Sequence, residues 1–110
     1  MRNTLTIIKK LEELDIYLNK IYPNFPKKDK LLKEEIKEVI KNIYVYIYII
    51  VYKYNQDIGI ETISLIKYLN NLIDNMYQKK IINNHKYLYI DNLVIDITKL
   101  LRGYVNEKSK

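Results

Sequence analysis

The chain carries few residues of the kinds that perform catalysis or bind metal ions. It has one histidine, His85, and no cysteine. Helical bundles that hold metals place Glu-x-x-His pairs on facing helices, and the sequence contains no such pair. A glycine-rich phosphate loop is also missing. We therefore expect a protein that is not an enzyme, with no catalytic residue, metal site or cofactor, and with His85 on the surface.

Basic residues are the remaining candidates for a binding site. The 110 residues have a formal net charge of +6, which favours attraction to polyanions such as RNA or DNA. The candidate nucleic-acid-binding residues are Lys27, Lys28, Lys30, Lys33, Lys37, Lys41, Lys99 and Arg102. The alternative is a solvated surface in a lysine-rich proteome, because the frequent residues here have AT-rich codons and alanine does not occur.

Hydrophobic periodicity predicts four helices that position these residues, at about 4–22, 29–55, 60–80 and 84–105. Apolar residues recur at steps of three and four within each segment, which is the spacing of one helix face. Pro23 and Pro26 separate the first two helices, since proline disfavours helical geometry just before itself. Asp29 and Asn83 are candidate N-caps for the second and fourth helices. Residues 55–59 are expected to form a short polar connection.

The segment NIYVYIYIIVYKYN, at 42–55, is compatible with a strand, a membrane span or a helix. Its uncharged apolar run is about half the ~20 residues that a membrane helix needs. The helical phase of residues 32–43 continues through it without glycine or proline, and no other stretch could pair with a strand. We therefore expect a helix that is apolar almost all round. One face enters the core, and the other is the candidate oligomer interface: Tyr44, Tyr48, Ile49 and Tyr52.

Short connections make sequential helices antiparallel neighbours. The predicted fold is therefore a single all-α domain over residues 1–110, an up-down-up-down antiparallel four-helix bundle. No secretory apolar segment occurs at the N-terminus. We expect a cytoplasmic protein with no membrane contact.

Three segments carry a resemblance to a known family. Residues 17–28 read YLNKIYPNFPKK, with Phe-Pro-Lys between the first two helices. Residues 81–87 precede and begin the fourth helix, and residues 101–105 read LRGYV. In order and spacing, residues 5–107 resemble the four-helix-bundle family of the accessory variability protein (Avd) of diversity-generating retroelements. The bundle proteins encoded in intervening sequences of bacterial 23S rRNA genes belong to the same family.

This resemblance implies properties that periodicity does not give. Avd-like proteins of bacteria and phages are non-catalytic, basic homopentameric barrels. They associate with a reverse transcriptase and bind template RNA during mutagenic cDNA synthesis. The chain departs from the family pattern at Arg102 and Tyr104, where relatives have glycine and tryptophan, and at Asn70 and Asp74, near which many relatives have arginines.

The resemblance therefore supports two functional hypotheses. The first is an Avd-like accessory protein that binds a reverse transcriptase and RNA. The alternative is a homo-oligomeric bundle of the 23S rRNA intervening-sequence type, with a structural role and no nucleic-acid binding.

Overall fold

The computed structural model describes the backbone of residues 2–108 and the side chains of residues 5–108. Four helices make up nearly all of this part: α1 (Arg2–Ile21), α2 (Lys30–Tyr52), α3 (Gln56–Gln78) and α4 (Asn84–Lys108). Two short 3-10 helices, η1 (Tyr22–Asn24) and η2 (Lys27–Asp29), connect α1 to α2. No strand occurs in residues 2–108, and the helical prediction for the tyrosine-rich segment is confirmed.

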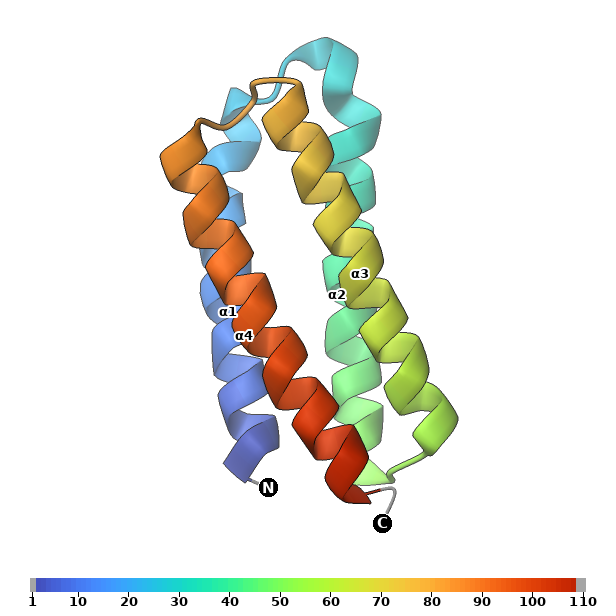
Figure 1. The fold of residues 1–110 in the computed structure, drawn as a ribbon. Helices are drawn as coiled ribbons and strands as arrows, with labels where there is room; N and C mark the ends of the chain where they lie inside the picture. Colours follow the sequence, from blue (N-terminus) through green and yellow to red (C-terminus); the bar gives the residue numbers. More distant parts are fainter. Residues whose placement is uncertain (1, 109–110) are drawn as a thin grey trace.

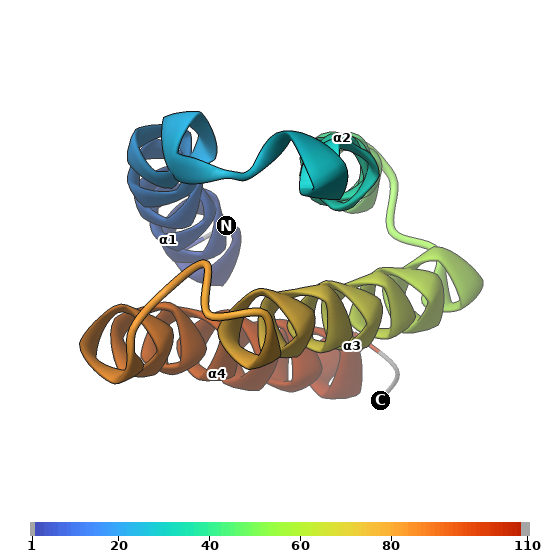
Figure 2. The same ribbon diagram turned by 90° about the horizontal axis from the view of Figure 1, so that it is seen from above.

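The helices form two layers, with α1 and α2 in one and α3 and α4 in the other (Figure 2). The α1–α2 and α3–α4 connections lie at one end of the molecule, whereas both termini and the α2–α3 connection lie at the other (Figure 1). Helix α1 packs mainly on α4, and α2 packs mainly on α3. The contact between α1 and α2 is looser.

The predicted apolar stripes form one core. The apolar stripe predicted for the first helix is buried throughout, with Leu14 and Leu18 at 0% exposure; its members are Ile7, Leu11, Leu14, Leu18 and Ile21. Ile43 and Ile47 of α2 are also buried, and they belong to the same core cluster as Ile73 of α3 and Ile90 of α4. Among residues 2–108, no helix combines the length and apolarity required to cross a bilayer.

The predicted boundary between the second and third helices is wrong. Helix α2 ends at Tyr52, and α3 begins at Gln56 rather than at residue 60. The Asn55 side-chain oxygen accepts hydrogen bonds from the backbone N–H groups of Asp57 (2.8 Å) and Ile58 (3.2 Å), so Asn55 is the N-cap of α3. Gly59, expected in a polar connection, is buried inside α3.

Asp29 precedes α2 as predicted, but its side chain makes no capping hydrogen bond. The carboxylate is buried instead, with Oδ1 3.0 Å from Lys79 Nζ at the end of α3. This ion pair ties η2 to the opposite layer of the bundle. The predicted cap at Asn83 is confirmed, since its side-chain oxygen accepts a 2.9 Å hydrogen bond from the Lys86 N–H.

The end of α3 depends on an unusual residue. Lys80 has φ 62°, in the left-handed region that glycine normally occupies after a helix. The Lys80 N–H donates to the Tyr77 carbonyl, and the Ile81 N–H donates to the Met76 carbonyl. This pair of hydrogen bonds is a Schellman motif, and it turns the chain toward α4.

Candidate functional site

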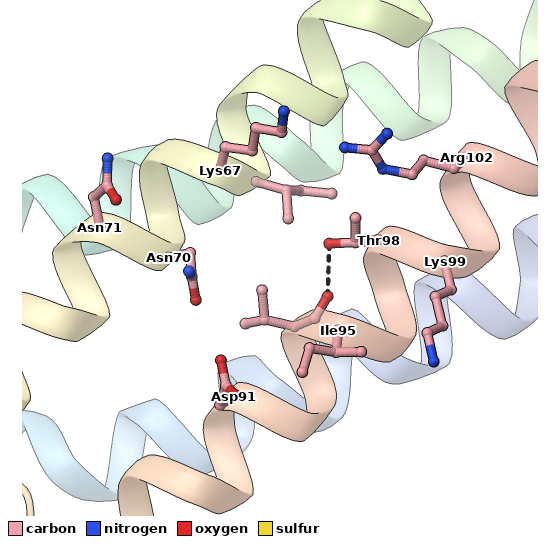
Figure 3. Close-up of a pocket in the computed structure, with 10 residues that line it drawn as sticks. Lys67, Asn70, Asn71, Asp91, Ile95, Thr98, Lys99 and Arg102 are labelled. Atoms are coloured by element: carbon pink, nitrogen blue, oxygen red, sulfur yellow. Dashed lines mark hydrogen bonds between the residues drawn. The ribbon is translucent and has the colours of Figure 1, made fainter.

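A groove of about 570 Å³ runs along the outer surface between α3 and α4 (Figure 3). Its apolar floor contains Ile66 and Val94, which also belong to the core, together with the partly exposed Ile95. Polar and charged side chains from both helices surround this floor: Lys67, Asn70, Asn71, Asp91, Thr98, Lys99 and Arg102. On α4 the positions 91, 95, 98 and 102 follow helical spacing, which explains why they share one face.

One end of the groove is basic. Lys67 of α3 and Arg102 of α4 extend toward each other, whereas Lys99 points away from α3 (Figure 3). All three side chains are exposed. The ion pairs found among residues 5–108, Lys10–Asp96 and Lys79–Asp29, do not involve them. Their charges are therefore available to an anion.

The other end presents hydrogen-bond acceptors. Asn70 and Asp91 face each other across the groove (Figure 3). The Asn70 side-chain oxygen is buried and has no hydrogen-bond partner. The Thr98 hydroxyl donates to the Val94 carbonyl at 2.8 Å, so Thr98 does not present a hydrogen-bond donor to the groove.

A tyrosine pair joins α3 to α4 beyond this acceptor end. The rings of Tyr77 and Tyr87 stack with centroids 4.5 Å apart, and the Tyr87 hydroxyl donates to Asp74 Oδ1 at 2.6 Å. The hydrogen bond to Asp74, followed by burial and by the charges of Asp74 and Asp91, raises the pKa of Tyr87 to about 12. Asp74 therefore has a structural contact in this chain.

The sequence-predicted basic residues do not form one surface. Lys99 and Arg102 lie at the α3–α4 groove, whereas the other six lie on η2 and α2. The start of α2 and the C-terminal part of α4 are at opposite ends of the bundle (Figure 1). Five of those six lysines are exposed, and only Lys33 is half-buried. The ammonium of Lys37 lies 5.0 Å from the centroid of the Tyr22 ring.

Lys67 was missed by the sequence analysis. It is an isolated cation on the polar side of α3, and nothing in its neighbourhood along the chain marks it as a site residue. Only the packing of α3 against α4 brings it close to Arg102. The basic position on α4 was therefore identifiable from sequence, but its partner across the groove was not.

The predicted oligomer interface includes the largest exposed apolar side chains of α2. Tyr52 is 94% exposed, Tyr48 is 56% exposed and Ile49 is 39% exposed. They line a surface hollow of about 750 Å³ together with Val45, Val51 and Lys53. Tyr44 differs, because it is half-buried against the core, and burial together with the nearby Asp15 charge raises its pKa to about 12. We call Val45, Tyr48, Ile49, Val51 and Tyr52 the α2 apolar patch.

His85 is exposed at the start of α4, where it was expected. Within residues 5–108, no three or more His, Cys, Asp or Glu side chains gather closely enough to hold a metal ion. Comparison with protein-family models, curated proteins and solved structures finds no match for this chain. The function must therefore be inferred from the residues and their geometry.

Proposed function

We propose that this protein is a non-catalytic, nucleic-acid-binding subunit of a homo-oligomer. The observation that carries the proposal is the basic end of the α3–α4 groove, where Lys67, Lys99 and Arg102 have no carboxylate partner among residues 5–108. Unpaired cations on a protein of net charge +6 attract phosphates and release counterions when they bind them. Such contacts give affinity with little sequence dependence.

The α2 apolar patch supports the oligomeric part of the proposal. Contiguous exposed apolar surface commonly marks a protein–protein contact, and tyrosine suits an interface because its ring is buried while its hydroxyl stays hydrated. The resemblance to Avd-like proteins extends the proposal to an up-down-up-down bundle that forms a cytoplasmic homopentamer. In that assembly it would act as the accessory protein of a reverse transcriptase and bind its template RNA.

The test is RNA affinity measured against salt concentration. The triple variant Lys67→Gln, Lys99→Gln, Arg102→Gln should bind single-stranded RNA more weakly and reduce the salt slope by about 2, at ~0.7 for each lost phosphate contact. The matched control removes three exposed lysines outside the groove, Lys9, Lys20 and Lys108. Equal losses in both variants, or wild-type binding no stronger than that of a neutral protein, would contradict the proposal.

The structural bundle without nucleic-acid binding is the second candidate. It is favoured by the α2 apolar patch, which needs a protein contact whether or not RNA binds. Light scattering combined with the RNA titration separates the two candidates. An oligomer with no salt-dependent RNA affinity would support the second.

A further inference from the structure

The α3–α4 groove has opposite chemistry at its two ends. Lys67 and Arg102 supply positive charge at one end, and Asn70 and Asp91 supply oxygen acceptors at the other (Figure 3). An apolar floor separates the two ends. A ligand that matches this arrangement carries an anionic group, a flat apolar body and hydrogen-bond donors at the far side.

The acceptor end of the groove contains two side chains with different accessibility. The Asn70 side-chain oxygen is buried with no partner, and a buried acceptor without a hydrogen bond is unfavourable. Asp91 faces it, and an ionised carboxylate can only accept hydrogen bonds. The Asn70 oxygen is fully covered and out of reach of a ligand, so Asp91 is the acceptor that a ligand with two adjacent N–H groups meets in the groove.

A nucleotide with a guanine base has these features. Its N1–H and 2-amino group lie side by side on the Watson–Crick edge, where a carboxylate can accept both hydrogen bonds. Uracil lacks an amino group, and adenine offers an acceptor next to its amino group, which Asp91 would repel. The groove volume of about 570 Å³ falls within the usual range for small-molecule sites, about 300–1,000 Å³.

We propose that the α3–α4 groove binds one guanine nucleotide unit. Its phosphate lies between Lys67 and Arg102, its base lies on Ile66 and Ile95, and its Watson–Crick edge faces Asp91. This inference rests on the proposed nucleic-acid function and adds a base preference to it. The same chemistry serves a free nucleotide and a guanosine within a single strand.

The decisive measurement compares ligands that differ by one group. We expect GMP to bind roughly 10-fold more tightly than IMP, which lacks only the 2-amino group, since one well-made base contact is worth about that much. AMP and UMP should bind no better than IMP, and inorganic phosphate should bind most weakly. Equal affinity for GMP and IMP would overturn the proposal.

The Asp91→Asn variant tests the assigned contact, because an amide replaces one acceptor with a donor. It should lower GMP affinity roughly 10-fold and lower IMP affinity less, because IMP makes only the N1–H contact to Asp91. Asp96→Asn is the matched control, because Asp96 is on the same helix but pairs with Lys10 outside the groove. Circular dichroism of both variants checks that each is folded, and a folded Asp91→Asn protein with unchanged GMP affinity would refute the assignment.

Competition with oligonucleotides tests the guanine preference separately from RNA binding. It also distinguishes a free nucleotide from a guanosine within a single strand. A short single strand containing guanosine should compete with GMP, whereas the same strand with uridine in place of guanosine should compete weakly. Salt-dependent RNA binding without any guanine preference would refute the assignment of a guanine base and would still support the proposed function. GMP binding without RNA binding would support the pocket for a free nucleotide and refute the proposed function.

Discussion

At the scale of single residues, the hydrogen bond from Tyr87 to Asp74 gives a pH-dependent contribution to stability. The pKa of Tyr87 rises from an ordinary value of 10.0 to about 12, chiefly because its hydroxyl donates to the Asp74 carboxylate. The folded protein therefore holds this proton more tightly than the unfolded chain. The stabilisation is complete below pH 10 and is lost as the pH rises through about 12.

Replacing Tyr87 with phenylalanine should remove this dependence. At pH 8 we expect Tyr87→Phe to lower the free energy of unfolding by about 1 kcal/mol, the usual value of one such hydrogen bond. The difference from wild type should shrink above pH 10, as measured by urea unfolding between pH 8 and pH 12. Tyr68→Phe is the control, since Tyr68 is an exposed tyrosine of α3 outside the α2 apolar patch. Wild-type and Tyr87→Phe stabilities that stay parallel over this range would contradict the prediction.

At the scale of the helices, the two glycines of the chain have opposite surroundings. Gly103 lies in α4 with no atom within 4 Å of the position that a Cβ would take, whereas a Cβ at Gly59 of α3 would lie 2.9 Å from Val105 Cγ2. Gly103 therefore only weakens its helix, while Gly59 allows α3 to approach α4. The close approach explains why this glycine is tolerated inside a helix.

Alanine at the two positions should act in opposite directions. Gly103→Ala should raise the free energy of unfolding by about 1 kcal/mol, because glycine costs about that much inside a helix. Gly59→Ala should be destabilising, since the branched and buried Val105 side chain must move. Urea unfolding measures both free energies. The double variant Gly59→Ala, Val105→Ala should be less destabilised than the sum of the two single variants, because the smaller side chain at 105 leaves room for the new Cβ. If both substitutions raise the free energy of unfolding equally, α3 and α4 are not in close contact at Gly59.

At the scale of the whole molecule, α2 has one face in the core of the bundle and another face exposed in the α2 apolar patch. Ile43 is 0% exposed at the centre of the bundle, whereas Tyr48, five positions later, is 56% exposed in the α2 apolar patch. The same substitution at these positions therefore separates folding from the proposed assembly.

Ile43→Asp should unfold the domain, because it buries a charge without a partner. Tyr48→Asp should keep the helical circular dichroism signal and reduce the mass in light scattering to that of one chain. If both variants lose helix equally, the division of α2 into a core face and an assembly face is wrong. A wild-type protein that stays monomeric at all concentrations would contradict the proposed oligomer.

Sequence periodicity was sufficient to predict the four helices and most of the core. The reason is local: apolar residues three and four positions apart share one face of a helix, so each stripe indicates its own buried side. The stripe of α1 and the continuous helix through the tyrosine-rich segment were both predicted in this way. The prediction failed at Asn55, where a capping side chain and not hydrophobicity determines the start of α3.

Tertiary structure alone decided which polar residues meet. Lys67 with Arg102, Asp74 with Tyr87 and Asp29 with Lys79 come from different elements. Their proximity depends on how far one helix is shifted and rotated against the next, and the repeat within a single helix carries no information on that register. The sequence by itself determined a basic, all-helical protein with an apolar second helix, and only the packing of α3 on α4 assembled the groove to which we assign its function.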